Sequence, residues 1–257
     1  MYKISIITPS LNQDKFIEEC ILSVRNQSYA NKEHIIIDGG SSDGTLSILK
    51  KYSDSIYWIS ELDRGQSDAI NKGFRMASGD LIGWLNADDI YEPNIFGTVS
   101  DYFNRNPEID MLYGDFKLIN ESGETIRLIQ EYNFDYKALK FGINSIAGQA
   151  VFFKKSILKN TGFLDINLHY AMDYELWTRI SKDFNIQHIP QVLGNFRLYS
   201  NCKSVAHPEK TKKEMDIILK RIHGKLGIKF YLVNLYYRYK RKIIKTLRLF
   251  ARERYIR

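Results

Sequence analysis

Cysteine and histidine are scarce in this chain. Its 257 residues include two cysteines, Cys20 and Cys202, and five histidines. Neither cysteine lies near another cysteine or a histidine at the spacing of metal ligands, so we expect neither a zinc site nor a disulfide framework. Two separate thiols fit a reducing compartment, and we therefore expect a cytoplasmic protein.

Long apolar runs are absent as well. A helix that spans a membrane needs about 18 or more consecutive apolar residues, and the sequence contains no such stretch. Residues 1–7 lead straight into a strand-like run and lack the charged and apolar regions of a secretory signal. We expect a protein that is not exported and that meets a membrane only at its surface, on the inner face of the plasma membrane.

Most of the chain also lacks an excess of positive charge. Residues 208–257 carry 16 Lys and Arg against 4 Asp and Glu, a net charge of +12, whereas residues 1–207 carry 21 against 26, a net charge of −5. Because the main part is acidic and shows no recognisable nucleic-acid-binding fold, we expect no nucleic-acid partner. The change in charge predicts a main domain over 1–207 and a basic helical tail over 208–257.

Apolar periodicity predicts alternating strands and helices in the first hundred residues. The predicted strands are 3–8, 34–37, 56–60 and 81–85, and the predicted helices are 16–24, 45–51 and 67–77. Because strands joined by helices run parallel, this part resembles a nucleotide-binding half. Further on, the sequence predicts strands over 111–119, 125–130, 146–153 and 186–196, a hairpin turn over 121–124 and a helix over 171–182. The second half is therefore expected to be mixed.

The most informative feature is a pair of adjacent carboxylates, Asp88 and Asp89, which follow the buried run Leu81–Trp84. Ligands of open parallel sheets bind outside the carboxyl ends of the strands. Carboxylate oxygens there suit Mg²⁺ or Mn²⁺ that carries a diphosphate. The alternative is that the pair caps a helix that begins near Pro93.

Polar residues also end the first two predicted strands. Thr8, Pro9 and Ser10 end the first strand, and Asp38 ends the second strand just before two glycines. We expect these residues to line one pocket, where Asp38 accepts a hydrogen bond from a base N–H and the glycines let the backbone approach the ligand. A capped loop between strand and helix would explain the same residues.

Several motifs, taken in order, resemble those of glycosyltransferase family 2, whose members are inverting nucleotide-sugar transferases with a GT-A type fold. The motifs are Ser5–Asn12, Asp38–Thr45, Asp63–Gly73, Ala77–Asp80, Leu85–Asp89 and Ala171–Trp177. The resemblance covers roughly residues 3–200. It implies an α/β fold with a Rossmann-like nucleotide-sugar-binding half over 1–100 and an acceptor-side half with a mixed central sheet over 101–207.

The resemblance also implies which residues bind the donor. Asp88 falls on the ligand of Mn²⁺ or Mg²⁺, and Asp89 stands beside it as a support or a sugar contact. Asn86 occupies a position that is often Asp in the family, and its neutral amide can bond a ribose or a phosphate but adds no charge to the metal site. The other implied donor contacts are Thr8, Pro9, Ser10, Asp38, Asp68, Asn71 and, at the diphosphate, Arg197.

Asp173 falls on the catalytic base of the family. Transfer with inversion needs one base that takes the proton of the acceptor hydroxyl as its oxygen attacks the anomeric carbon. Met172 replaces the acid that commonly precedes this base, which leaves an apolar wall. Gln149, in the segment Gly148–Phe152, is a candidate contact of the transferred sugar. Each of these roles has a simpler alternative. Asp173 could be a solvated aspartate at a helix start, Arg197 a solvated arginine at a strand end, and Gly148–Phe152 a buried strand.

These observations favour a metal-dependent inverting glycosyltransferase. It would move a sugar from a nucleoside-diphosphate donor, with UDP as the expected nucleotide, to a hydroxyl of a lipid-linked cell-surface polysaccharide intermediate. A nucleotidyltransferase is an alternative, although the loop Pro9–Lys15 has no glycine to hold a triphosphate. A non-catalytic nucleotide-sugar-binding assembly subunit is another. The sugar, the acceptor and the linkage depend on pocket shape, which no single residue encodes.

The C-terminal tail interleaves aromatic, aliphatic and basic residues from Lys225 onward, in a pattern typical of an amphipathic helix. One interpretation is that this helix lies on an anionic membrane and brings the enzyme to a lipid-linked acceptor. The other is that its apolar stripe packs on the main domain, or on a second subunit in a homodimer.

Overall fold

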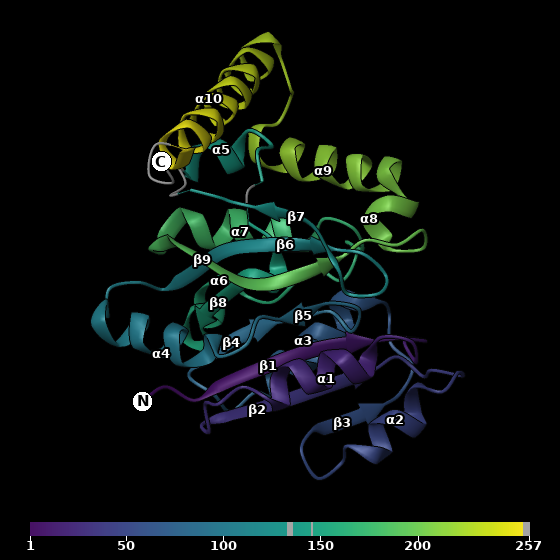
Figure 1. The fold of residues 1–257 in the computed structure, drawn as a ribbon. Coiled ribbons are helices and arrows are strands. Elements are labelled where there is room, and N and C mark those ends of the chain that lie inside the picture. Colours follow the sequence, from purple (N-terminus) through teal and green to yellow (C-terminus); the bar gives the residue numbers. More distant parts are fainter. Residues whose placement is uncertain (133–135, 145, 254–257) are drawn as a thin grey trace.

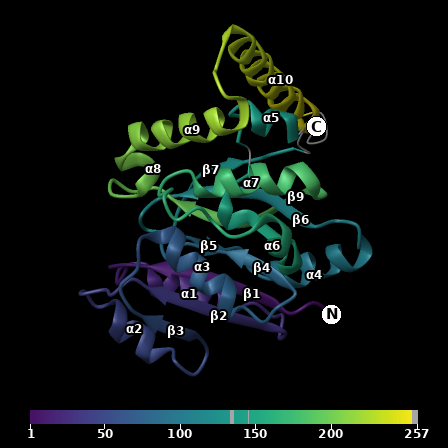
Figure 2. The same ribbon diagram turned by 180° about the vertical axis from the view of Figure 1, so that it is seen from behind.

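A mixed β-sheet forms the centre of the protein (Figures 1 and 2). The computed structural model describes residues 1–132, 136–144 and 146–253, and within them it contains a nine-stranded sheet. Its strand order is β3-β2-β1-β4-β8-β6-β9-β5, with β7 beside β6. Helices α3, α6 and α7 cover one face of the sheet, and helices α1, α2 and α4 cover the other.

The first half alternates strands and helices, as the apolar pattern predicts. Its elements are β1 (Ile4–Ser10), α1 (Ile17–Arg25), β2 (Lys32–Asp38), α2 (Thr45–Lys51), β3 (Tyr57–Ser60), α3 (Gln66–Met76) and β4 (Leu81–Trp84). All four strands are parallel. Ile35 and Ile37 pack with α3, whereas Ile36 packs with α1 and α2. Because both faces are covered, β1, β4 and the second half of β2 are continuously buried rather than alternating, whereas the edge strand β3 is partly exposed.

The second half adds antiparallel pairs. Its elements are β5 (Ile90–Tyr91), α4 (Ile95–Arg105), β6 (Met111–Ile119), β7 (Thr125–Ile129), α5 (Tyr136–Lys140), β8 (Val151–Lys154), α6 (Leu158–Thr161), α7 (Met172–Asp183) and β9 (Ile186–Arg197). β8 runs antiparallel to both β4 and β6, and β9 runs parallel to β6 and antiparallel to β5. The prediction of a mixed sheet in an α/β fold is therefore confirmed.

The strand predicted over 146–153 is shorter than expected. It begins only at Val151, because Gly148–Ala150 forms a short 3₁₀ turn, and residue 145 lies outside the described residues. This turn packs closely on β9: a Cβ added to Gly194 would lie 2.3 Å from the carbonyl oxygen of Gln149. The close packing explains the glycine in β9, because any side chain there would collide with the turn.

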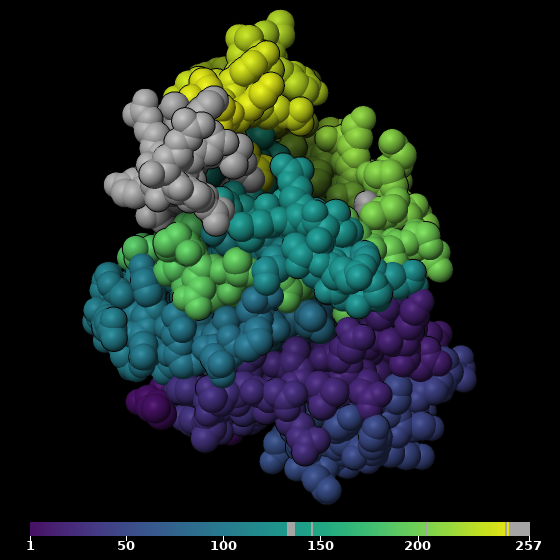
Figure 3. Space-filling model, in the orientation of Figure 1, coloured from purple at the N-terminus to yellow at the C-terminus, as the bar shows by residue number. Residues whose placement is uncertain are grey.

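Three further helices follow β9: α8 (Lys203–Ala206), just before the basic tail, and α9 (Pro208–His223) and α10 (Ile228–Glu253) within it. Ile218, Leu219 and Phe230 belong to the same hydrophobic cluster as Trp177 of α7, so α9 and the start of α10 pack on the main body. α10 lies at the end of the molecule opposite β3 and α2 (Figures 1 and 3). Among the described residues no helix is both long and apolar enough to cross a membrane.

Candidate active site

A cavity of about 830 Å³ opens at the carboxyl ends of β1 and β4. Its volume is typical of sites for small molecules and cofactors. Its walls come from segments that are far apart in the sequence: the ends of β1 and β4, the start of α3, the 3₁₀ turn, the loop before α7 and the chain after β9. Of the predicted site residues it brings together Pro9, Ser10, Asn86, Asp88, Gln149 and Asp173.

Asp88 faces this cavity from the loop after β4. Its Oδ2 accepts a hydrogen bond of 2.9 Å from the hydroxyl of Tyr199. Burial raises the pKa of Asp88, while the Tyr199 hydrogen bond and the charges of Arg197 and Lys203 act in the opposite direction. A carboxylate so placed favours the approach of a cation, which would relieve the cost of burying its charge.

Asp89 points the other way, into the protein, and does not line the cavity. It is 1% exposed. Its Oδ1 accepts the backbone N–H of Arg197 at 2.9 Å, and its Oδ2 accepts the Asn86 amide at 3.2 Å. Burial and the neighbouring charge of Asp88 raise the pKa of Asp89 well above its usual value. Asp89 therefore supports the loop that presents Asp88, and its contact with a sugar stays a prediction. Neither aspartate caps α4, which begins six residues later at Ile95.

The amide of Asn86 explains why this position is not a carboxylate. Its Oδ1 accepts hydrogen bonds from Gln66 Nε2 at 2.7 Å and Trp84 Nε1 at 3.0 Å, while its Nδ2 donates to Asp89. An ionised aspartate accepts hydrogen bonds but cannot donate one. An aspartate here would therefore put a second negative charge against Asp89 and would lose the bond to it.

Arg197 lies inside the protein rather than in a flexible loop, which corrects the sequence-based expectation. It ends β9 and is 0% exposed. Its Nε donates to the Asp88 carbonyl at 2.8 Å, its Nη1 donates to the Glu121 carbonyl at 2.8 Å, and its Nη2 pairs with Glu19 at 2.5 Å. The guanidinium also lies over the Phe16 ring, 4.8 Å from its centroid. These contacts use its N–H groups within the protein, so Arg197 positions Asp88 and does not line the cavity. Its contact with the diphosphate stays a prediction.

Thr8 and Asp38 lie behind the cavity wall at the ends of β1 and β2. Both are 0% exposed. Thr8 Oγ1 is 2.9 Å from His34 Nε2. Asp38 Oδ2 accepts hydrogen bonds from Ser41 N at 2.9 Å and Ser60 Oγ at 2.7 Å. Asp38 thus shapes the loop after β2, and its contact with a base stays a prediction.

Asp68 and Asn71 lie on α3, also outside the cavity lining. Asp68 accepts the backbone N–H of Arg64 at 3.2 Å. Asn71 bonds both the N–H and the carbonyl of Leu164, each at 2.9 Å, and so fastens α3 to the segment after α6. Both side chains serve the packing of the pocket wall, and their contact with the donor stays a prediction.

Asp173 lines the cavity from the first turn of α7. Its Oδ1 accepts the backbone N–H of Tyr174 at 2.7 Å. Burial, with a smaller contribution from the charge of Glu214, raises the pKa of Asp173 to about 6, and hydrogen bonds from backbone N–H groups limit the rise. Asp173 is thus not a freely solvated aspartate at a helix start. A carboxylate of this basicity is suited to take a proton near neutral pH.

Glu214 of α9 supports the loop that leads into α7. Its carboxylate accepts the backbone N–H groups of His169, Tyr170 and Ala171 at 2.8, 2.7 and 2.9 Å. The sequence interpretation missed Glu214 because it lies in the basic tail and belongs to no motif. The tail thus contributes to the support of the site. The division of the chain at residue 207 stays a prediction.

Lys203 is a second residue that the sequence interpretation missed. It lines the cavity, and its Nζ donates to Gln66 Oε1 at 2.7 Å and to the His169 carbonyl at 2.9 Å. Desolvation lowers the pKa of Lys203, while the charges of Glu214, Asp88 and Asp63 act in the opposite direction. In the sequence, nothing marks Lys203 as a site residue except its place in a polar stretch after the last predicted strand. Polar stretches of this kind follow strands in many proteins.

Three buried polar atoms of the cavity wall lack a hydrogen-bond partner among the described residues: Ser10 Oγ, Gln13 Oε1 and Gln149 Nε2. Buried polar groups are nearly always hydrogen-bonded in native proteins. Partners from a bound ligand would satisfy these three atoms.

A divalent cation fits Asp88 only together with a ligand. The described residues contain no group of three or more His, Cys, Asp or Glu side chains that could hold a metal by themselves. Mg²⁺ and related hard cations commonly bind through one or two carboxylates, substrate phosphates and water. The oxygen chemistry and the cavity position of Asp88 agree with that arrangement.

Solved structures share this fold. Residues 1–349 of TarS from Staphylococcus aureus, in complex with UDP-GlcNAc, match with a TM-score of 0.68 and 17% identity over 84% of this chain and 65% of that one. The mannosyltransferase PcManGT from Pyrobaculum calidifontis, in complex with GDP-Man and Mn²⁺, matches with a TM-score of 0.66 and 16% identity over 91% and 68%. The fold is therefore of the GT-A type, as predicted.

The sequence comparison identifies the family. Residues 5–162 match Glycosyl transferase family 2, so the chain belongs to this family and is a glycosyltransferase. It is 29% identical over 239 residues to the Escherichia coli UDP-Glc:α-D-GlcNAc-diphosphoundecaprenol β-1,3-glucosyltransferase WfgD, covering 91% of this chain and 92% of that protein. It is 27% identical over 232 residues to the Escherichia coli chondroitin synthase, of which it spans 34%. The predicted enzyme class is confirmed.

Proposed function

We propose that this enzyme transfers a sugar from a UDP-sugar, with inversion and with a divalent cation, to a hydroxyl of a lipid-linked glycan. The observation that carries the proposal is that Asp88 and Asp173 line the same cavity. The name of the Escherichia coli relative, which specifies a UDP-Glc donor and a diphosphoundecaprenol-linked acceptor, supports both substrate classes.

The donor diphosphate would lie between Asp88 and Lys203. Asp88 would hold Mn²⁺ or Mg²⁺, which when bound would neutralise the charge that develops on the leaving diphosphate. Lys203 lines the same cavity and would add a second positive charge there. The base would lie at the ends of β1 and β2, where Pro9 and Ser10 form the wall and Asp38 holds the loop behind it. Gln149 Nε2 would donate to a hydroxyl of the sugar.

Asp173 would act on the acceptor. It would take the proton of the attacking hydroxyl as the new glycosidic bond forms and the bond to the diphosphate breaks on the opposite face of the anomeric carbon. With a pKa raised to about 6 the side chain is ionised at neutral pH, yet it is more basic than an ordinary aspartate. Both properties favour proton abstraction.

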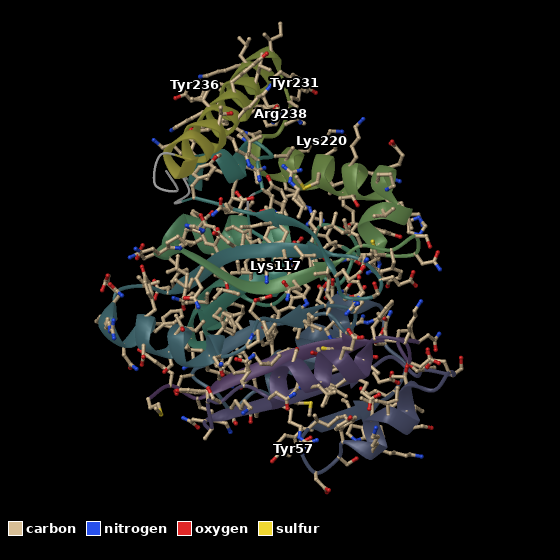
Figure 4. All side chains as sticks on the ribbon, in the orientation of Figure 1. Tyr57, Lys117, Lys220, Tyr231, Tyr236 and Arg238 are labelled. Atoms are coloured by element: carbon tan, nitrogen blue, oxygen red, sulfur yellow. The ribbon has the colours of Figure 1, made fainter. Side chains whose placement is uncertain are left out.

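We also propose that α10 brings the enzyme to an anionic membrane as a peripheral protein. The outer face of this helix exposes Ile228, Tyr231, Leu232, Leu235, Tyr236, Tyr239 and Ile243, hereafter the outer stripe. Figure 4 shows Tyr231 and Tyr236 on this helix. Their spacing places them on one side of the helix. An exposed aromatic stripe with basic neighbours fits the headgroup region of a bilayer.

The Asp173→Asn variant tests the proposed chemistry. We expect kcat for sugar transfer from UDP-sugars to a lipid-linked acceptor with Mn²⁺ to fall by about 10²- to 10⁴-fold, which is the usual worth of a general base. The dissociation constant of the donor, measured by calorimetry, should stay within about twofold, because Asp173 does not hold the donor.

Asp183→Asn provides the matched control, since Asp183 is exposed at the other end of α7. It should leave both quantities unchanged. Unaltered turnover of Asp173→Asn, or an equal loss of donor binding, would contradict the role of Asp173 as the base.

A further inference from the structure

A second, smaller hollow of about 400 Å³ lies under α10. Gly142, Ile143, Asn144, Arg238 and Arg241 line it. Asn144 also lines the active-site cavity. The hollow therefore adjoins the catalytic centre on the side where α10 contributes two arginines.

Arg241 is held in place at the wall of this hollow. Its Nη1 donates to the Asn144 carbonyl at 3.0 Å, and its Nη2 pairs with Glu131 at 2.9 Å. The side chain of Glu131 is 2% exposed, so the carboxylate of this ion pair is shielded from solvent. The arginine keeps further N–H groups that can bind an anion in the hollow.

Arg238 lies one helical turn before Arg241 and is exposed. No hydrogen bond or ion pair joins it to any other residue that the structure describes. Among the described residues, the lining of the hollow holds two guanidinium groups and no carboxylate, and the Glu131 carboxylate that pairs with Arg241 balances only one of them. Arginine binds phosphate with paired, charge-assisted hydrogen bonds, so the hollow suits a phosphate or diphosphate group.

The position of the hollow along α10 indicates which anion it would hold. The outer stripe exposes apolar and aromatic groups, and Arg238 and Arg241 line the hollow next to the catalytic cavity. A lipid-linked acceptor has the same three parts in order: an apolar chain, a diphosphate and a sugar that carries the reacting hydroxyl.

We propose that Arg238 and Arg241 bind the diphosphate that joins the acceptor sugar to its lipid, and so position the sugar at Asp173. The proposal rests on the proposed function, because it assumes that the acceptor is lipid-linked. It adds a binding site at α10 that is separate from the donor diphosphate site at Asp88.

A binding measurement tests the site without requiring sugar transfer. The full chain is first saturated with UDP and Mn²⁺ to fill the donor pocket and is then titrated with farnesyl diphosphate, with farnesol as the uncharged counterpart. The Arg238→Ala variant should bind farnesyl diphosphate at least tenfold more weakly and should bind farnesol as before. Lys242→Ala removes the same charge from an exposed residue of the same helix that does not line the hollow, and it should change neither value.

A kinetic measurement then asks whether the site serves the acceptor. Arg238→Ala should raise KM at least tenfold for an acceptor sugar on a prenyl diphosphate, and should leave KM unchanged for the same sugar on an octyl chain and for the donor. An equal loss with both acceptors would indicate a structural role and overturn the proposal.

Two further outcomes distinguish this proposal from binding of Arg238 to membrane headgroups and from a failure of the proposed function. If Arg238→Ala leaves farnesyl diphosphate binding intact but weakens binding to phosphatidylglycerol vesicles, the arginine contacts bilayer headgroups and the proposal is wrong. If farnesyl diphosphate binding needs Arg238 while no lipid-linked acceptor is ever glycosylated, the anion site stands and the proposed function fails.

Discussion

Adjacent residues in the loop after β4 have different environments and therefore different uses. Asp88 turns toward the cavity and the Tyr199 hydroxyl, whereas Asp89 turns inward and holds the backbone of Arg197. Two neighbouring carboxylates repel each other, and the N–H donors around Asp89 offset that repulsion. The neutral Asn86 completes this arrangement, because it donates to Asp89 without adding a charge.

The raised pKa of Asp173 predicts the pH dependence of transfer. A base works only when it is unprotonated, so kcat/KM should fall about tenfold per pH unit below about pH 6 and should level off above it. The measurement is kcat/KM between pH 4.5 and 8 in buffers of constant ionic strength.

Glu214→Gln supplies the control for this profile. The negative charge of Glu214 raises the pKa of Asp173, so its removal should shift the acid limb to lower pH. The single amide oxygen of the glutamine can still accept the N–H groups of Tyr170 and Ala171, and only the bond from His169 is lost. A profile without an acid limb near pH 6, or a shift to higher pH in Glu214→Gln, would contradict the assignment.

At the scale of elements, α9 and α10 are integral to the enzyme. α9 supplies Glu214 to the loop before α7 and Thr211 to the cavity wall. α10 packs through Phe230 and donates from Asn234 to the Phe141 carbonyl, while its outer stripe stays exposed. Of the two interpretations of the tail, packing on the main body is observed for one face, and membrane contact remains the proposal for the other.

The outer stripe predicts reversible membrane binding. We expect the double variant Leu232→Ser and Tyr236→Ser to bind phosphatidylglycerol-containing vesicles at least tenfold more weakly in a sedimentation assay. Burial of each such side chain contributes about 1.5–3 kcal/mol. Both residues are exposed, so the melting temperature should stay the same.

Tyr57→Ser is the control for the outer stripe. Tyr57 is 66% exposed and lies at the opposite end of the molecule from α10 (Figure 4). It should leave vesicle binding unchanged. Equal weakening by Tyr57→Ser, or tight binding by the double variant, would argue against α10 as the membrane-facing element.

At the scale of the whole molecule, Arg197 connects parts that are distant in the sequence. It ends β9, pairs with Glu19 of α1, and donates to carbonyls of the loop after β4 and of the turn after β6. A buried arginine in this position holds the Asp88 loop between the two halves of the sheet.

Replacement of Arg197 should destabilise the fold. Arg197→Met leaves the carbonyls of Asp88 and Glu121 without their partner, and we expect the free energy of unfolding to fall by about 2–4 kcal/mol, since each unsatisfied buried group costs about 1–3 kcal/mol. Urea denaturation measures this change. Arg221→Met, which breaks an ion pair of an arginine that is 52% exposed, should cost less than about 1 kcal/mol. Similar losses in the two variants would show that Arg197 has no special structural role.

Much of the fold could be predicted, because periodicity is local. The apolar runs of β1, β2 and β4 and the spacing in α1 and α3 report burial on one or both sides of each element. The two-residue β5 and the start of β8 could not be predicted. β5 is too short to show a period, and the turn before β8 exists because Gly194 of another strand lets it approach.

The sequence by itself determined most of the strands and helices along the chain, the family, and the position of the acidic loop after β4, because these depend on residues that are close together along the chain. Only the tertiary structure decided that Asp88 faces the cavity while Asp89 does not, that Arg197 is buried, and that Lys203 and Glu214 join the site. Each of these depends on the direction of a side chain and on contacts between segments that are far apart in the sequence, and no local pattern encodes either.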